Sequence, residues 1–103
     1  MYARVTNIRF APEMGAEVSG VARGLGPILG RQRGFEGFQV LTDPEAGEGI
    51  IVSFWATDAD AQASEAGDSY TGQMSMLSSY LYEPLAPKTY EVSVRWRARE
   101  RGA

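Results

Sequence analysis

The sequence predicts a single α+β domain of the ferredoxin-like type, with a four-stranded antiparallel sheet. Three observations predict this class. The expected elements run in the order strand, helix, strand, strand, helix, strand, which is the split βαβ arrangement. A chain of 103 residues suits one hydrophobic core. The sheet carries apolar residues on both faces, whereas the two helical segments can cover only one of them.

The first strand and the first helix occupy the N-terminal third of the chain. Aromatic and β-branched residues favour a strand over residues 2–10. One face of this strand carries Tyr2, Thr6, Ile8 and Phe10, and the other carries Ala3, Val5, Asn7 and Arg9. Apolar residues at three- and four-residue steps predict a helix over residues 14–29. Several glycines and Pro27 weaken that helix, so its formation depends on packing.

The second and third strands are predicted to form an antiparallel hairpin. Residues 35–42 and 50–56 have strand character, and residues 43–49 between them include the turn formers Asp43, Pro44 and Gly47. The run Ile-Ile-Val-Ser-Phe-Trp in the third strand is apolar on both faces. We therefore expect this strand to be central and covered on both sides.

A second helical segment and a last strand complete the domain. Thr57 or Asp58 is predicted to cap a helix that extends to Ala66. A second helical piece follows, with an apolar stripe that contains Tyr70, Met74, Leu77 and Leu81. Residues 89–97 are predicted to form the last strand. The domain is expected to span residues 1–98, with a flexible tail over 99–103.

The uncovered face of the sheet predicts a homodimer. We expect this face to carry Tyr2, Ile8, Phe10 and part of the apolar third strand. An apolar patch of this kind usually marks an interface, and two sheets that pack face to face would bury it in a two-fold dimer.

Composition excludes several kinds of chemistry. The chain has no Cys and no His, so thiolate sites, Cys nucleophiles, the commonest metal ligand and the usual base near pH 7 are missing. We therefore expect no metal and no cofactor. The nine acidic residues between Gly34 and Pro87 stand without any Lys or Arg, which argues against nucleic acid as a partner. Neither a membrane-spanning run nor an export signal is visible, so a cytoplasmic location is expected.

Three segments carry a resemblance to a known family. These are the opening strand over residues 2–10, the Gly-Phe-Glu-Gly-Phe start of the second strand at 34–38, and the run Gly-Ile-Ile-Val-Ser-Phe-Trp-Ala-Thr-Asp-Ala-Asp at 49–60. Over about residues 2–97 the chain resembles the antibiotic biosynthesis monooxygenase family of dimeric α/β-barrel proteins. The resemblance implies a pocket between the sheet and the helices. It also implies relatives that include cofactor-free oxygenases of phenols and quinones, and haem-degrading enzymes.

The resemblance and the local pattern together suggest six site residues. Asn7 and Trp55 match pocket positions of the haem-degrading branch, but the haem-ligating histidine has no counterpart, so haem chemistry is not expected. Asn7, Trp55 and Tyr70 are the catalytic candidates, and the substrate-binding candidates are Arg9, Met74 and Tyr80. Each has an alternative role. Asn7 could be an exposed amide, Arg9 could pair with an acid, and the aromatic side chains could belong to the core or an interface.

Two functions remain open at this point. The first is a monooxygenase that needs no metal or flavin and acts on an aromatic, phenolic or quinoid small molecule. The alternative is a protein of the same fold that binds a small hydrophobic aromatic ligand, or only dimerises, without catalysis. The absence of an acid–base residue suited to pH 7 favours this alternative.

Overall fold

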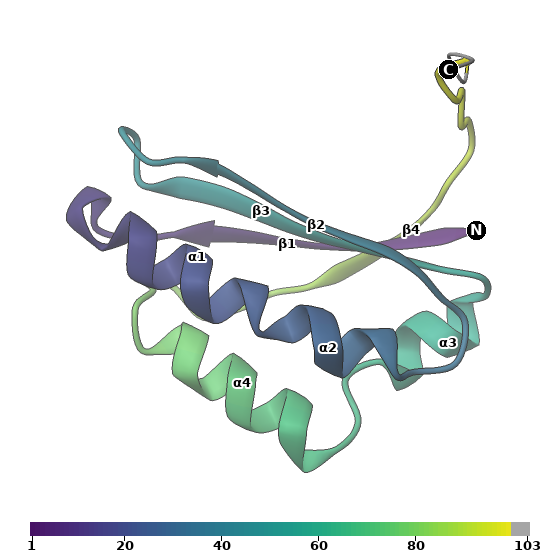
Figure 1. The fold of residues 1–103 in the computed structure, drawn as a ribbon, viewed down its shortest axis with the longest axis horizontal. Coiled ribbons are helices and arrows are strands. Elements are labelled where there is room, and N and C mark those ends of the chain that lie inside the picture. The colour runs from purple at the N-terminus through teal and green to yellow at the C-terminus, as the bar shows by residue number, and fades with distance from the viewer. Residues whose placement is uncertain (100–103) are drawn as a thin grey trace, which may run out of the picture.

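Four antiparallel strands form one sheet in the order β2-β3-β1-β4, and the helices cover one of its faces (Figure 1). The computed structural model describes residues 1–99 of the chain. Its strands are β1 (Tyr2–Arg9), β2 (Phe35–Asp43), β3 (Glu48–Trp55) and β4 (Lys88–Glu91). The predicted α+β ferredoxin-like class is therefore confirmed, and β3 is central as expected.

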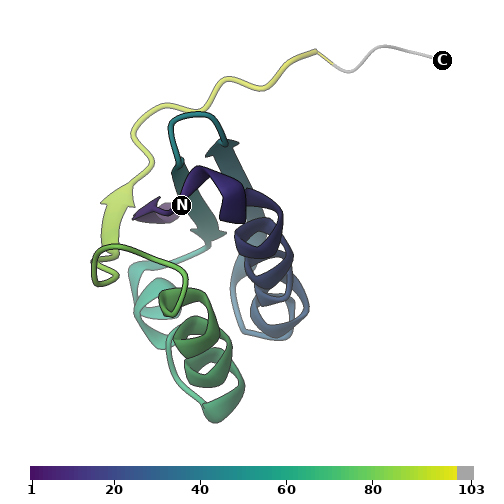
Figure 2. The same ribbon diagram turned by 90° about the vertical axis from the view of Figure 1, so that its left-hand side faces the viewer.

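Five helical segments connect the strands. They are η1 (Pro12–Met14), α1 (Gly15–Arg23), α2 (Leu25–Gly30), α3 (Asp58–Ala63) and α4 (Asp68–Ser78). Seen along the sheet, α1, α2, α3 and α4 lie on the same side of the strands (Figure 2). Thr57 caps α3 as predicted, because its Oγ1 accepts a hydrogen bond of 3.0 Å from the backbone N–H of Asp60.

The predicted first helix is divided at Gly24. Pro27 falls in the first turn of α2, where its missing N–H costs little. The side chain of Gln73 on α4 donates a 2.7 Å hydrogen bond to the carbonyl of Val21 beside the break. A Cβ at position 24 would overlap that amide, so the side chain of Gln73 would have to shift to admit one. Pro27 also lacks the N–H that would bond the carbonyl of Arg23, the last residue of α1, so the apolar stripe is divided into two short helices.

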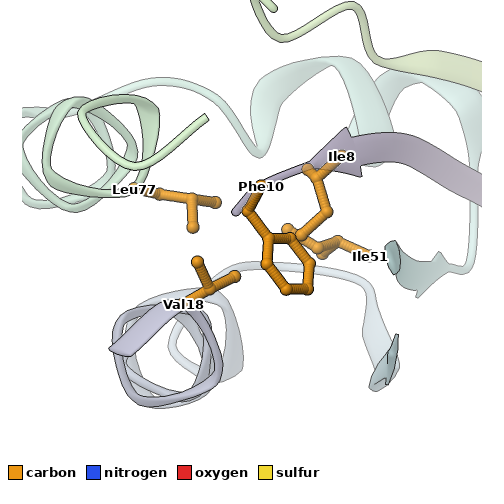
Figure 3. Packing of buried hydrophobic residues seen from close by; sticks show 5 residues of the cluster. All are labelled: Ile8, Phe10, Val18, Ile51 and Leu77. Carbon is orange, nitrogen blue, oxygen red and sulfur yellow. The ribbon is translucent and has the colours of Figure 1, made fainter. Parts of the chain in front are cut away.

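The register of the sheet decides which face of β1 meets the helices. Ile8 and Phe10 point toward Val18 of α1 and Leu77 of α4, together with Ile51 of β3 (Figure 3). All five side chains are buried. The expectation that Ile8 and Phe10 lie on the uncovered face is therefore wrong. These large apolar groups gain most from burial, so their face became the core.

A second cluster of buried residues lies nearer the other end of the sheet. The indole of Trp55 is fully buried against Leu25 and Leu29 of α2 and Ala61 of α3. The ring of Phe35 meets it edge-on, with centroids 5.5 Å apart. Tyr2 is partly buried against this cluster, so its expected place on the uncovered face is also wrong.

The uncovered face carries the other half of each strand. Cross-strand partners share a face, so pairs such as Ala3–Phe54, Val5–Val52 and Asn7–Ile50 lie together there. Leu41 of β2 and Tyr90 of β4 join them and are about half exposed. The prediction that β3 is covered on both sides is thus not met within one chain. We call this surface the open face.

The last strand is shorter than predicted. β4 ends at Glu91, because β1, its only neighbour, begins at Tyr2, and the final bond runs from the N–H of Val92 to the carbonyl of Met1. Residues 92–99 continue as an arm that leaves the sheet (Figure 1). Val94 and Trp96 on this arm are 81% and 93% exposed. Most of the tail predicted over 99–103 lies outside the described residues.

Candidate functional site

A small cavity lies between the sheet and the helices, next to the second cluster. Its volume is about 20 Å³, which is room for about one water molecule. Strands β1 and β3 form its floor, and α2, α4 and the segment after α3 form its walls. Its apolar lining is Leu25, Leu29, Ile51 and Met74, and its polar lining is Arg4, Thr6, Ser53, Ser64 and Tyr70. We call this cavity the niche.

Arg4 is the charged group of the niche. It lies on the helix-covered face of β1, and its side chain is only 12% exposed. Its Nε donates a 2.7 Å hydrogen bond to the carboxylate of Glu65, which also pairs with Nη2. Its Nη1 donates a 2.6 Å hydrogen bond to the hydroxyl of Thr89 on β4. Two elements on different sides thus fix the guanidinium in place.

Tyr70 brings a phenol from α4 to the same cavity. Burial raises the pKa of its hydroxyl to about 12, and the negative charge of Glu65 adds to the rise while Arg4 opposes it. At neutral pH this phenol is therefore a neutral hydrogen-bond donor. A neutral donor beside a fixed cation suits an oxygen that carries negative charge.

Three further hydroxyls line the niche from the strands and from the end of α3. Ser53 accepts a 2.8 Å hydrogen bond from the indole N–H of Trp55. Ser64 donates a 2.6 Å hydrogen bond to the carbonyl of Ala61. Thr6 makes no side-chain hydrogen bond to another of the described residues, so its hydroxyl is available to a molecule in the cavity. Thr6 and Ser53 lie on neighbouring strands and face the same space.

The structure brings together only part of the predicted site. Tyr70 and Met74 line the niche, and Trp55 lies behind it through its bond to Ser53. Asn7 and Arg9 lie on the open face, on the other side of the sheet. The expectation that Asn7 and Trp55 share one pocket is therefore wrong. Trp55 pairs with Tyr2 and shares its face, and Asn7, five positions further along β1, points to the other face.

Arg9 and Tyr80 lie away from the niche. Arg9 pairs with Glu83 at 3.0 Å in an exposed ion pair, which is the alternative considered for it. Tyr80 follows the end of α4 and packs against the first cluster of buried residues. Neither residue lines the niche, so their assignment to a substrate site remains a prediction.

The sequence reasoning missed Arg4, Thr6, Ser53, Ser64 and Glu65. One signal for Arg4 was available, because an arginine that shares a strand face with Ile8 is enclosed by apolar neighbours and needs a partner. The partner Glu65 is 61 residues further along the chain. No local pattern identifies a pair at that separation.

A wider groove lies on the open face at the hairpin end of the sheet. Its volume is about 430 Å³. Its lining comes from β1, β2 and β3 and includes Asn7, Arg9, Leu41, Asp43, Glu48 and Ile50. Because it lies on the uncovered surface of the sheet, it belongs to the open face rather than to the niche.

The described residues hold neither a metal-binding cluster nor a membrane-spanning helix. No cluster of three or more carboxylates that could hold a metal ion occurs in the part of the chain that the structure describes. Among these same residues, no helix is long and apolar enough to cross a membrane.

Comparison with known proteins agrees with this fold. The structure is similar to that of a candidate antibiotic biosynthesis monooxygenase from Nitrosomonas europaea, with a TM-score of 0.78 and 18% identity over 91% of this chain and 100% of that one. It is similar to SnoaB, a cofactor-independent oxygenase from Streptomyces nogalater, with a TM-score of 0.77 and 14% identity over 91% and 94%. It is also similar to Rv0793 from Mycobacterium tuberculosis, with a TM-score of 0.76 and 10% identity over 91% of this chain and 96% of that one.

The fold and the niche define a ferredoxin-like domain with a small cavity under its helices. The sequence profile of the family described as antibiotic biosynthesis monooxygenase matches residues 1–72, well over half of the chain. The chain therefore belongs to the antibiotic biosynthesis monooxygenase family, as its sequence predicted. No protein of curated function gives a significant match.

Proposed function

We propose that this protein is a cofactor-independent monooxygenase that oxidises an aromatic, phenolic or quinoid small molecule in the niche. The observation that carries the proposal is the lining of the niche, where a fixed guanidinium and a neutral phenol meet apolar walls. Membership of the family supports the reaction class. The relative SnoaB, described as a cofactor-independent oxygenase, supports the absence of a cofactor.

The electron balance of such a reaction restricts the substrate. Reducing dioxygen by four electrons without an external reductant requires the substrate to supply all four. A methylene carbon can do so when it becomes a carbonyl, because R₂CH₂ + O₂ gives R₂C=O + H₂O. One oxygen atom enters the carbonyl, and the other leaves as water with both hydrogens of the methylene. A methylene conjugated with an ionised phenol is electron-rich enough to react with dioxygen, so a phenol with such a carbon is the proposed substrate.

The proposed roles follow the geometry of the niche. Tyr70 donates a hydrogen bond to the phenolic oxygen, and Met74 contacts the ring. Trp55 supports the niche from behind, where its indole N–H bonds Ser53, and does not touch the substrate. A benzene-sized ring needs a cavity of about 150 Å³. The walls of the niche must therefore move apart when the substrate enters.

Oxygen consumption tests the proposal. The assay compares a panel of phenols and quinols that carry a conjugated methylene with their O-methyl ethers, which cannot ionise. We expect turnover of at least one phenol, none of its ether, and a loss of about tenfold or more in kcat on Tyr70→Phe. An inactive panel would reject the proposed reaction. Binding of the same phenols without oxygen uptake would instead support the non-catalytic alternative. That alternative is favoured by Glu65, the carboxylate beside the niche, because its pairing with Arg4 leaves it poorly placed to act as a base.

A second copy of the chain is the proposed partner, packed against the open face. The support is the apolar character of that face, together with the exposed Val94 and Trp96 on the arm that leaves its edge. Sedimentation should give a mass near twice 11.2 kDa at micromolar concentration. A single species of 11.2 kDa would reject the homodimer. The cytoplasm is the proposed location, and cell fractionation tests it.

A further inference from the structure

The donor groups of Arg4 are only partly used within the protein. A guanidinium has five N–H groups in a planar fork. The Nε–H and one hydrogen on Nη2 serve Glu65, and one hydrogen on Nη1 serves Thr89. Two N–H groups, one on each terminal nitrogen, have no partner among the residues that the structure describes. Since Arg4 lines the niche, these groups are available to a molecule that enters it.

The surroundings of these two donors select a negatively charged oxygen on an aromatic ring. Arg4 is largely shielded from water, so its charge acts over a short distance with little screening. Tyr70 and Thr6 add hydroxyl groups to the same cavity. The walls from α2 are Leu25 and Leu29, which suit a flat apolar body rather than a hydrated anion such as phosphate.

We propose that Arg4 forms an anion-binding subsite that takes the substrate as a phenolate, with the ionised oxygen on its two free N–H groups. Glu65 binds the guanidinium through Nε and Nη2 and fixes its direction. The placement of this subsite in the niche rests on the proposed function, but a protein can bind a phenolate there without oxidising it. The subsite would remain even in a protein that only binds its ligand.

The two charged side chains at the subsite, Arg4 and Glu65, should have opposite effects on phenolate binding. The titratable groups that face it are Arg4 on β1, Glu65 after α3 and Tyr70 on α4, whereas α2 contributes only apolar side chains. The carboxylate of Glu65 repels a phenolate that the guanidinium attracts. Loss of each charge should therefore move phenolate binding in opposite directions.

Binding of 4-nitrophenol tests this proposal, because its phenolate is yellow, ionises near neutral pH and cannot undergo the proposed oxygenation. The absorbance of the phenolate, followed against pH with and without protein, gives the affinity of each ionisation state. We expect the protein to lower the apparent pKa of the bound phenol. Arg4→Gln should weaken phenolate binding by about tenfold or more, the value of a hydrogen bond to a charged group. Glu65→Gln should strengthen it.

Two controls separate charge from folding. Arg9→Gln removes the other arginine of β1, which is also paired with a glutamate but lies on the open face, and should leave binding unchanged. The neutral 4-nitroanisole, which cannot ionise, should bind Arg4→Gln and the parent protein within about twofold of each other. Arg4→Lys, which keeps the charge but loses the fork, serves if Arg4→Gln fails to fold.

The outcomes are distinct. Unchanged phenolate affinity in Arg4→Gln, or weaker binding in Glu65→Gln, would overturn the subsite. An active oxygenase whose phenolate binding ignores Arg4 would keep the proposed function and reject only the subsite. A protein that binds phenolate through Arg4 but oxidises no phenol of the panel would keep the subsite and reject the proposed reaction.

Discussion

Replacing Trp55 with Phe should destabilise the protein and leave ligand binding in the niche nearly unchanged. The indole is fully buried, it lies outside the niche lining, and its N–H donates to Ser53 at 2.8 Å. The lost ring leaves roughly 40 Å³ empty, which costs about 1 kcal/mol at about 24 cal/mol per Å³. The lost hydrogen bond costs about 1 kcal/mol more. The total is about 2 kcal/mol, or a fall in Tm of about 8–16 °C for a domain of this size.

Thermal and urea unfolding followed by circular dichroism measure this change. Tyr82→Phe is the control, because it also trims an aromatic side chain but at a position that is mostly exposed, and it should shift Tm by less than about 2 °C. The affinity for 4-nitrophenol, measured on the same proteins, tests the catalytic alternative for Trp55. A stability change below about 0.5 kcal/mol would refute the packing of the indole. A tenfold loss of affinity without loss of stability would place Trp55 in the site itself.

Three further predictions concern single side chains. The pKa of Tyr70 is raised from 10.0 to about 12 in the folded state, so this phenol ionises first in the unfolded chain. The free energy of unfolding should therefore be unaffected below about pH 10 and fall by at most about 2 kcal/mol by pH 12, after allowance for solvent screening. Tyr70→Phe should remove this fall in urea unfolding measured at alkaline pH. Thr57→Ala removes the acceptor for the backbone N–H of Asp60 and should cost about 1 kcal/mol in urea unfolding, whereas Thr57→Ser should cost much less. Gly20→Ala in α1 meets open space and should raise stability by about 0.5–1 kcal/mol, while Gly47→Ala, at φ 68° with its Cβ against a backbone carbonyl, should lower it by more than about 1 kcal/mol; equal Tm values for the two variants would contradict the hairpin geometry.

Periodicity and turn chemistry predicted the order of the elements because both are local properties. The cap at Thr57, the hairpin between β2 and β3 and the apolar stripe of α4 each depend on residues close together in the chain. The errors fall where a distant contact decides. Gln73 of α4 bonds the carbonyl of Val21 beside the break at Gly24, and β4 stops at Glu91 because β1 provides no further partner.

The site was predicted less well than the fold for the same reason. Tyr70 and Met74 were found because they lie on one helical stripe that faces the sheet. The pairing of Arg4 with Glu65 joins the first strand to the end of α3, and no spacing in the sequence indicates it. The resemblance to a family suggested Asn7 and Trp55, but their positions 48 residues apart gave no information about which face of the sheet each would occupy.

The choice of which face of β1 meets the helices explains two wrong predictions, the residues of the open face and the place of Asn7 in the site. Alternation in β1 gives two sets of residues, but it does not say which set meets the helices. The apolar area of each set could have decided. One set holds Ile8 and Phe10, whereas the other holds Asn7 and Arg9, which burial under a helix would leave without water. The larger apolar set must therefore form the core, and Arg4 goes with it as the one arginine of the strand that is enclosed and needs a buried partner. The same choice leaves Arg9 exposed. Comparing phenolate binding by Arg4→Gln and Arg9→Gln therefore tests which face of β1 meets the helices. It also tests whether the substrate meets the charge of Arg4.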